Sequence, residues 1–462
     1  MFKKLIGTKA FYKRVFILTI PIMIQQGITN FVNMLDNVMV GTIGQAQSTG
    51  VAVSNQLMFV FNLFIFGAIS GAGIFTAQYF GKGDIEGVKQ TFRFKIIFCT
   101  LLAATGILLL YFKSDDLIML YLNEEDNALL AAESLAFAKS YLYIMIIGLL
   151  PYTIAQCYGS TLRESGQSTV PMIAGVTAVI VNLSLNGVLI FGKLGAPCLG
   201  VKGAAIATVI SRFVELAILI AYTFIKRQKC IFILEGWKSP YISFLLIGKI
   251  FKKGMPLMIN EGLWASGMAT VNGLYAQRGL DVVSANNISQ TFFNVFSVAF
   301  FSVGIAVGIL LGHDLGAGKE KEEIKDTAFK LIAFSVFIGV IVAVLYAANA
   351  IFIPRVYNIS DNAKSLATSL MQITALSIPI DAFAHASYFT LRSGGKVIIT
   401  LIFDCIFTWA VSVTAAFCLI NFTSFNILIV FFIVQMLNII KCILGYIFVK
   451  QGSWIKNIIS NV

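Results

Sequence analysis

Long apolar runs alternate with short polar or glycine-rich breaks along the whole chain. A helix needs about 20 apolar residues to cross a bilayer, whereas the strands of a membrane barrel are shorter and alternate in polarity. The runs therefore predict membrane-spanning α-helices, which satisfy their own backbone hydrogen bonds in lipid. Twelve spans are predicted near residues 15–40, 51–78, 92–112, 134–156, 169–192, 203–225, 249–276, 284–312, 328–348, 365–388, 398–419 and 426–449.

The composition fits a chain that lies mostly in lipid. Of its 462 residues, 58% are hydrophobic and only 12% are charged, against roughly a quarter charged in soluble domains. The longest breaks are 113–133 and 225–248, so no separate soluble domain is predicted. The seven cysteines are scattered without a CxxC or Cys/His pattern, which predicts neither a disulfide framework nor a metal site. The basic start leads into a long apolar run without a small-residue cleavage site, which is typical of a first span rather than a signal peptide.

The basic residues predict the orientation of the chain. Of 34 Lys and Arg residues, 26 fall on the side that holds both termini and the even-numbered loops, counting Lys441 near the end of the last span. Seven fall on the opposite side, and Arg212 lies inside a span. Because basic loops stay in the cytoplasm, both termini are predicted to be cytoplasmic. The net charge of +12 is thereby assigned to one membrane face, where it meets anionic lipid headgroups rather than nucleic acid.

Three short motifs recur in the same order in the two halves of the chain. The pairs are 21–27 with 256–262 and 80–84 with 315–319, both at an offset of 235, and 161–166 with 390–395 at an offset of 229. Each half holds six spans, so the second half enters the membrane from the same side and the repeat is parallel. The predicted parts are an N-terminal lobe at 1–225, a cytoplasmic linker at 226–248 and a C-terminal lobe at 249–462. Such repeats are typical of transporters with a cavity at the repeat interface, although duplicated channels, enzymes and static bundles are alternatives.

An ordered set of residues carries a resemblance to a known family. The set comprises Pro21 and Asp36 in span 1, Gly81-Lys-Gly83 after span 2, Thr161-Leu-Arg163 with Gly166 after span 4, Asn182 and Asn186 in span 5, Gly200-Val-Lys-Gly-Ala-Ala-Ile-Ala-Thr208 entering span 6, Pro256 and Glu261 in span 7, and Asp381 with Leu391-Arg392 in and after span 10. It resembles the MATE (multidrug and toxic compound extrusion) transporters over nearly the whole chain. Acidic residues in spans 1, 7 and 10 together resemble the NorM-like bacterial branch.

The resemblance implies a fold and a function. The expected fold is an all-α membrane protein with two parallel six-helix lobes in a V around a central cleft. The expected activity is export of amphipathic, often cationic compounds in exchange for Na⁺ or H⁺ by alternating access. It implies a monomeric transporter of the bacterial cytoplasmic membrane, not an enzyme, with membrane lipids as neighbours and no cofactor besides the coupling ion.

The family's cation and proton sites carry over onto residues in both predicted lobes. In the N-terminal lobe they are Asp36, Asn182, Asn186 and Thr208, and in the C-terminal lobe Glu261 and Asp381. The sequence departs from some NorM-type members, which have a tyrosine shortly before the span-10 aspartate. Here that stretch is Leu376-Ser-Ile-Pro-Ile-Asp381, which predicts that the second site lacks one ligand.

Acidic residues inside spans are functional candidates in their own right, because burying a charge in lipid is costly. Asn33 precedes Asp36 by three residues, and Asn182 and Asn186 are four apart, so each pair shares a helix face. A carboxylate with amide oxygens suits a hard cation such as Na⁺, and the same desolvated carboxyl is a candidate proton carrier. The alternative is a structural carboxyl satisfied by the asparagines.

The remaining in-span polar residues leave alternatives open. Asp381 and His385 are four apart, so they form either a proton-sharing pair or a hydrogen bond that only orients the helix. Asp404 has no evident partner in the sequence and is a candidate cavity-lining residue. Arg212 and Glu215, three residues apart, are predicted to neutralise each other.

The absence of a Walker motif indicates an ion gradient rather than ATP as the energy source. The alternative function is a flippase for a lipid-linked oligosaccharide or precursor, which would favour a basic cavity around pyrophosphate. The mainly acidic in-span charges favour cationic substrates instead. A membrane enzyme would need a catalytic constellation, and the sequence contains none that we recognise.

Overall fold

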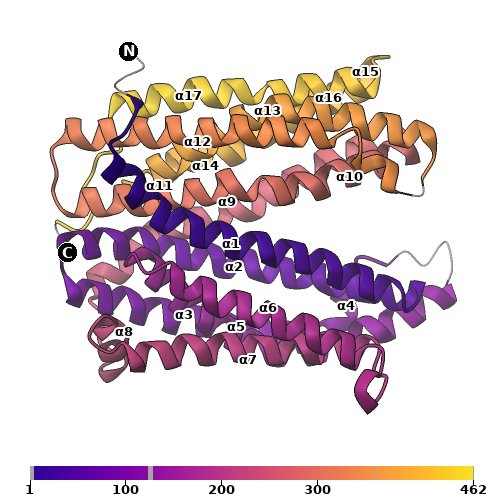
Figure 1. Cartoon of the computed structure of the whole chain (residues 1–462), viewed down its shortest axis with the longest axis horizontal. Helices are drawn as coiled ribbons and strands as arrows, with labels where there is room; N and C mark the ends of the chain where they lie inside the picture. The colour runs from indigo at the N-terminus through magenta and orange to yellow at the C-terminus, as the bar shows by residue number, and fades with distance from the viewer. Residues whose placement is uncertain (1–4, 123–127, 358, 461–462) are drawn as a thin grey trace. The chain divides into compact units, whose positions relative to one another are not determined.

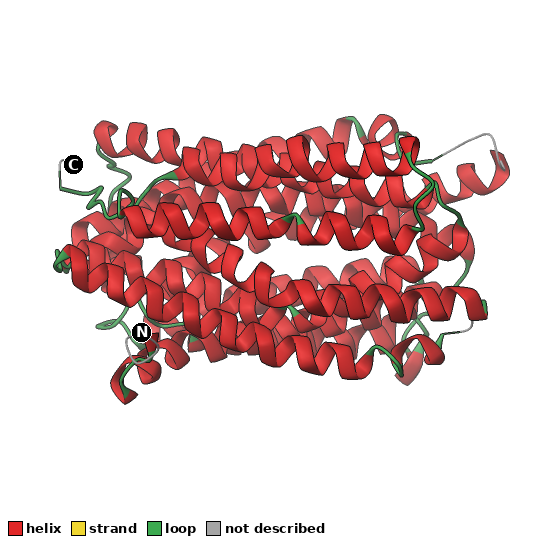
Figure 2. Cartoon of the chain, turned by 90° about the horizontal axis from the view of Figure 1, so that it is seen from above, coloured by secondary structure: helices red, strands yellow, loops and turns green. Residues whose placement is uncertain are grey.

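The computed structural model describes residues 5–122, 128–357 and 359–460, and every regular element in these ranges is helical (Figures 1 and 2). Eleven of these helices are long and apolar enough to cross a membrane. They include ten of the predicted spans at nearly the expected positions, together with α11 (Val298–Gly316), which forms the second half of the predicted span at 284–312. The chain is therefore a multi-pass helical membrane protein, as predicted.

The predicted seventh span is a helix of unusual polarity. It corresponds to α9 (Phe244–Ala276), which has 33 residues but does not meet the apolar criterion of the other eleven. Lys249, Lys252 and Lys253 lie in its first three turns and Glu261 lies near its middle. At 1.5 Å per residue, α9 is about 50 Å long, which is more than a bilayer requires.

Two compact units make up the chain. One of them contains residues 24–76 and 85–254. Its elements are the later part of α1 (Lys9–Gly41), most of α2 (Gln45–Lys82), α3 (Ile85–Phe112), α4 (Ser114–Met119), α5 (Ala128–Glu164), α6 (Thr169–Leu189), η2 (Lys193–Gly195), α7 (Val201–Ile225), α8 (Ile231–Leu234), η3 (Glu235–Lys238) and the start of α9. We call it the N-terminal unit.

The C-terminal unit contains the described residues up to Met23, residues 77–84, and those from Met255 onward. Besides the rest of α9 it has α10 (Leu280–Phe296), α11, α12 (Lys321–Asn349), η4 (Ile353–Val356), α13 (Asp361–Ser393), α14 (Val397–Leu401), the π-helical η5 (Ile402–Ile406) and η6 (Thr408–Val413), α15 (Thr414–Phe422), α16 (Ile427–Met436) and α17 (Asn438–Gln451). The two units are defined by contacts in the structure, whereas the predicted lobes are defined by the repeated motifs of the sequence. The lobe boundaries at 1–225 and 249–462 therefore stay a prediction.

The turns at the repeated motifs have matching backbone conformations. Gly83 and Gly318, paired at the offset of 235, have φ values of +78° and +69°. Gly166 and Gly395, paired at the offset of 229, have φ values of +79° and +73°. Glycine is the residue that adopts this left-handed region without a steric cost. The two halves thus use the same device to end corresponding helices, which supports the predicted duplication.

Both ends of the chain meet the same end of α11. Near the N-terminus, Arg14 forms an ion pair with Asp314 at 2.9 Å. Near the C-terminus, the Asn457 amide donates to the carbonyl oxygen of Leu315 at 3.2 Å. Ends on one side of a membrane require an even number of crossings, so α9 must be counted as a twelfth crossing. The side of the membrane on which the termini lie stays a prediction.

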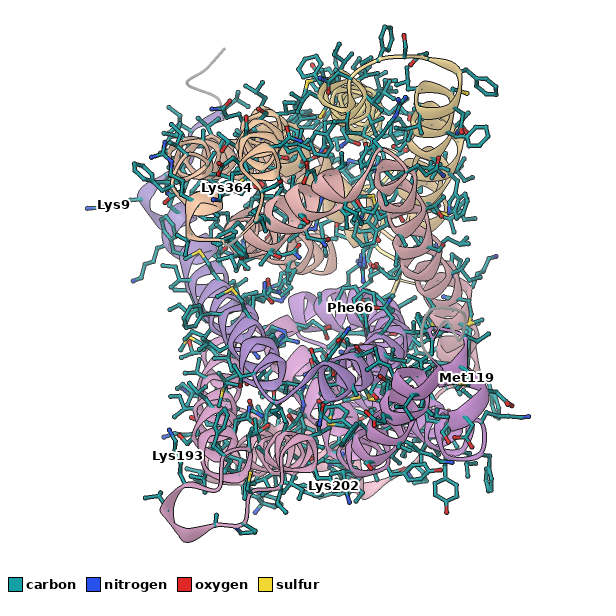
Figure 3. All side chains as sticks on the ribbon, turned by 90° about the vertical axis from the view of Figure 1, so that its right-hand side faces the viewer. Lys9, Phe66, Met119, Lys193, Lys202 and Lys364 are labelled. Carbon is teal, nitrogen blue, oxygen red and sulfur yellow. The ribbon has the colours of Figure 1, made fainter. Side chains whose placement is uncertain are left out.

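Two of the basic residues counted as loop charges have side chains buried among the helices. Lys95 is fully buried within α3 beside Glu164, and Lys441 lies in the interior of the span formed by α16 and α17. Lys9, by contrast, points outward, and Lys193 and Lys202 lie at the connection between α6 and α7 (Figure 3). The count of loop charges was therefore wrong for Lys95 and Lys441, although the bias between the two sides is unchanged in direction.

The predicted linker at 226–248 is docked against α3 of the N-terminal unit. The Arg93 guanidinium donates to the carbonyl oxygens of Gly236 at 2.9 Å and Tyr241 at 3.0 Å. Lys89 forms an ion pair with Glu235 at 2.5 Å, which holds the pKa of that carboxyl below its usual range. The linker therefore has a defined path on this unit instead of being a free tether.

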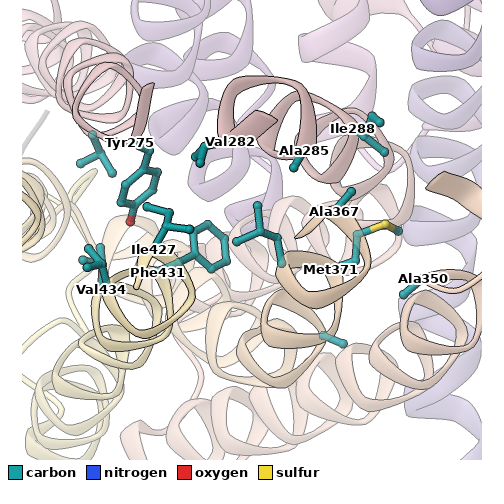
Figure 4. Close-up of a cluster of buried hydrophobic side chains, with 14 of the residues drawn as sticks. Tyr275, Val282, Ala285, Ile288, Ala350, Ala367, Met371, Ile427, Phe431 and Val434 are labelled. Carbon is teal, nitrogen blue, oxygen red and sulfur yellow. The ribbon is translucent and has the colours of Figure 1, made fainter. Parts of the chain in front are cut away.

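The core of the C-terminal unit joins α9, α10, α13 and α16 (Figure 4). Ala285 and Ala367 have no exposed surface. Because their side chains are small, α10 and α13 can approach closely beside Met371 and Phe431. Lipid is as apolar as these side chains, so van der Waals packing rather than water exclusion holds such helices together.

Gln78 ties together three segments of the same unit. Its amide nitrogen donates to the carbonyl oxygens of Ser393 at 3.0 Å and Lys456 at 3.2 Å, and its oxygen accepts from the backbone N–H of Ile458 at 2.9 Å. The side chain is fully buried. It therefore links the end of α2 to the end of α13 and to the C-terminal segment.

We expect Gln78→Leu to lower the thermal unfolding midpoint of the purified protein by several degrees. Each buried backbone group left without its partner costs about 1–3 kcal/mol. The measurement is fluorescence-detected thermal unfolding in detergent. Gln451→Leu, at an exposed site at the end of α17, is the control and should change the midpoint little. An unchanged midpoint for Gln78→Leu would contradict this role of the side chain.

Candidate ion-coupling sites

Asp36 lies in a polar cluster formed by three helices of the N-terminal unit. The Asn186 amide of α6 donates to Asp36 Oδ1 at 2.7 Å. One terminal atom of the Asn182 amide lies 3.0 Å from Asp36 Oδ2, and the other lies 3.1 Å from Thr208 Oγ1 of α7. The structure thus brings together all four residues that the family resemblance assigned to this lobe, and it confirms that the two asparagines share a face.

The two asparagines that contact Asp36 are buried, so water has little access to this part of the cluster. Asn182 and Asn186 are 6% and 1% exposed, and Oδ1 of Asn186 is buried without a hydrogen-bond partner. Within the described residues, no basic side chain forms an ion pair with Asp36. Asn33, the other predicted neighbour, is exposed, and no hydrogen bond joins it to Asp36 in this part of the chain.

The predicted acids of the C-terminal unit lie in two neighbouring hydrogen-bond networks. Asp381 accepts from Ser377 at 3.2 Å and from Asn438 of α17 at 3.2 Å. Glu261 accepts a hydrogen bond from the Tyr388 hydroxyl and lies near Arg392. Tyr388 follows Asp381 by two helical turns and is a partner of Glu261 rather than of Asp381 in the described part of the chain, so the predicted missing ligand beside Asp381 stays a prediction.

Asp404, which had no evident sequence partner, has two partners in the structure. The Lys441 ammonium lies 3.2 Å from Asp404 Oδ1. The Asn260 amide donates to Asp404 Oδ2 at 3.3 Å and to the Tyr388 hydroxyl at 3.5 Å. Sequence spacing could not reveal these partners because they lie on α9 and α17, 144 and 37 residues away.

His385 is surrounded by aromatic rings rather than by acids. Its ring centroid lies 4.6 Å from that of Phe301 and 4.9 Å from that of Phe389. Its Nδ1 is buried without a partner, and no hydrogen bond joins it to Asp381 among the described residues. The two residues are not paired in this conformation, so their proton-sharing role stays a prediction.

Two further ion pairs account for other charges in the N-terminal unit. A guanidinium nitrogen of Arg212 lies 3.6 Å from a carboxylate oxygen of Glu215, which confirms the predicted ion pair. Lys95, with no exposed surface, forms an ion pair with Glu164 and donates to Ser160 at 3.1 Å and Thr161 at 3.3 Å. This pair was not predicted from the sequence, although a lysine at the start of an apolar run was a signal of it.

Buried carboxylates on duplicated, membrane-spanning helices are features of an ion-coupled membrane transporter. The MatE family model matches residues 21–188 and 256–417. The chain belongs to the MATE family of transporters.

Several relatives support this membership. The chain is 25% identical over 449 residues to a probable multidrug resistance protein NorM of Thermotoga maritima, covering 95% of this chain and 92% of the relative. It is 25% identical to the multidrug resistance protein NorM of Aliivibrio fischeri, covering 87% and 85% of the two chains. The predicted resemblance to the NorM-type branch is therefore confirmed.

Solved structures confirm the predicted fold class. A MOP superfamily transporter from Pyrococcus furiosus has a TM-score of 0.84 at 18% identity, with 98% of each chain covered. A mutant of a Vibrio cholerae MATE transporter also has a TM-score of 0.84 at 18% identity, covering 96% of this chain and 97% of that one. At this identity the likeness concerns the fold alone.

We expect Glu164→Gln to destabilise the protein by about 3–5 kcal/mol, because Lys95 would remain buried and charged without its partner. The double variant Lys95→Met/Glu164→Gln should recover much of this loss. Glu323→Gln, which breaks the exposed Lys319–Glu323 pair, is the matched control and should cost at most about 1 kcal/mol. Thermal unfolding in detergent measures all three, and equal midpoints for Glu164→Gln and Glu323→Gln would contradict the role of the buried pair.

Proposed function

We propose that this chain is a secondary active antiporter that exports amphipathic, cationic compounds in exchange for H⁺ or Na⁺. The proposal extends to this chain what the names of its relatives say of them, namely multidrug resistance. Its structural basis is one observation, that among the described residues Asp36 contacts neutral amide groups and forms no ion pair with a basic side chain. Alternating access to the two sides of the membrane would then follow from the different affinities of two conformations for the ion and the substrate.

A carboxylate without a basic partner must obtain its charge balance elsewhere. The cost of an uncompensated charge in a membrane interior is several kcal/mol. A proton or a small cation lowers that cost, and it can leave again when the site opens to water. Asp36 is suited to such exchange, whereas Glu164 and Glu215 are already balanced by Lys95 and Arg212.

The asparagines can serve either coupling ion. When Asp36 is ionised, the Asn182 amide nitrogen can donate to Oδ2, and after rotation by 180° the amide oxygen can accept the proton of a neutral carboxyl. For Na⁺, the carboxylate, the two amide oxygens and the Thr208 hydroxyl form a set of hard oxygen ligands. We therefore assign the coupling ion to this cluster and leave its identity to experiment.

The C-terminal acids form a second candidate set. Asp381 accepts hydrogen bonds from the neutral groups of Ser377 and Asn438 and lies within the field of the Lys441 charge, which pairs with Asp404, whereas Glu261 lies near Arg392. We propose Asp381 as a secondary proton or cation site and Glu261 as a charge that is largely balanced within the protein. No cofactor is needed for either role.

Electrostatics favour this function over a flippase for lipid-linked substrates. A pyrophosphate would require basic side chains that are available to it. Lys95, Arg212 and Lys441 are instead engaged with carboxylates of the protein. We further propose that the chain works as a monomer in the bacterial cytoplasmic membrane, with both termini in the cytoplasm.

We expect the reconstituted protein to move a fluorescent lipophilic cation across liposome membranes when either a pH gradient or a Na⁺ gradient is imposed. The gradient that drives transport identifies the coupling ion. Empty liposomes and dissipated gradients are the controls. Absence of transport under both gradients, from protein that elutes as a single folded species, would contradict the antiporter and favour the flippase.

We expect Asp36→Asn to abolish drug resistance in a pump-deficient bacterial host, because the amide can neither release a proton nor balance a cation. Surface expression and folding should be retained, since asparagine fits the same hydrogen-bond donors. Asp361→Asn, whose side chain is fully exposed, is the control and should retain resistance. Full resistance in Asp36→Asn would exclude this carboxyl as the coupling group.

A further inference from the structure

Lys441 is a charged residue in the interior of the last membrane span. The helices α16 and α17 form one candidate span, Ile427–Gln451. Lys441 precedes Gln451 by ten residues, which corresponds to about 15 Å along the helix. Its side chain is only 12% exposed. It is therefore too deep to be treated as one of the loop charges that set orientation.

The ammonium group is held in a specific position. It lies 3.2 Å from Asp404 Oδ1 and 5.0 Å from the centre of the Phe407 ring. One turn earlier on the same helix, Asn438 donates to Asp381. Two polar residues of α17, three positions apart, thus contact the two carboxylates of the neighbouring helices.

Asp404 lies within a π-helical segment, η5, whose wider turn is a departure from regular helix that recurs at functional sites. Its second oxygen accepts from Asn260, which is 1% exposed. Oδ1 of Asn260 is buried without a hydrogen-bond partner. A carboxylate and an unpaired amide oxygen are therefore close together, and both are hard oxygen ligands.

Neighbouring groups extend the network around Asp404. The Tyr388 hydroxyl connects Asn260, Glu261 and Arg392. The network contains the acids Glu261 and Asp404 and the bases Arg392 and Lys441, and Lys441 also interacts electrostatically with Asp381. It differs from the Asp36 cluster, in which no basic side chain of the described residues forms an ion pair with the carboxylate.

We infer that Lys441 is a resident counter-cation. Its ammonium group occupies the position beside Asp404 and Asn260 that a free monovalent cation would otherwise occupy. Because the ammonium is attached to α17, it has a high effective concentration at Asp404 and loses little translational freedom on binding. Free Na⁺ is therefore excluded from this network in the wild-type protein. The inference rests on the proposed antiport in one respect, namely that the ion excluded by Lys441 is a coupling ion.

The test is Na⁺ binding to the purified full-length protein at about pH 8, where unperturbed carboxyl groups are ionised. Radioactive Na⁺ is measured with choline as the replacement cation. We expect Lys441→Gln to bind about one more Na⁺ per chain than wild type, since the oxygen ligands would then need a cation. Lys441→Gln/Asp404→Asn should bind as wild type does, and so should Lys441→Arg.

Lys450→Gln is the matched control, because Lys450 is an exposed residue of the same helix that lies over the Tyr446 ring. It should leave Na⁺ binding unchanged. Equal binding by folded Lys441→Gln and wild type would overturn the inference, as would a gain that persists when Asp404 is also replaced.

A second measurement keeps the inference testable if Lys441→Gln is recovered poorly. The folded yield of this variant is compared after extraction in Na⁺ and in choline. A higher yield in Na⁺ that disappears with Asp404→Asn supports the resident counter-cation, and equal yields overturn it. Wild-type transport in liposomes is measured separately, so failure of the antiporter would be distinguished from failure of this inference.

Discussion

The absence of water in the bilayer interior is the constraint on which this structure depends. A polar group on these helices must find its partner within the protein, because lipid supplies none. The consequences are visible at several sites. Gln78 satisfies three backbone groups at once, and Lys95 is balanced by Glu164 and two hydroxyl groups. Asp36 is an informative exception, because its partners among the described residues are neutral.

Buried charge is handled in two ways in this chain. The N-terminal unit pairs Glu164 with Lys95 and Glu215 with Arg212. It also holds the Asp36 carboxylate among asparagines and a threonine, an arrangement that can accept a proton or a cation and release it. The C-terminal unit places Lys441 and Arg392 close to Asp404 and Glu261. A duplicated fold can thus diverge in function while the turns that close its helices stay alike, as the matched glycines illustrate.

Transport requires that polar clusters change partners without exposing charge to lipid. An amide such as that of Asn182 can exchange donor for acceptor by a rotation, at no cost in packing. A tethered ammonium keeps a carboxylate balanced while helices move, because it cannot diffuse away. These two devices, one exchangeable and one permanent, are a physical basis for assigning different roles to Asp36 and Asp404.

The sequence alone determined the spans, the repeated motifs and the family resemblance, since apolar length and motif offsets are local properties. The resemblance, and not the spacing, predicted that Asp36, Thr208 and two asparagines form one site. Even Asn182 and Asn186 could be placed on one face from spacing. What faces that surface depends on helix packing, so only the tertiary structure decided the partners of Asp404, His385 and Lys95. The same holds for Lys441, which the sequence assigned to a span end by its neighbours and which tertiary contacts identify as a buried counter-ion.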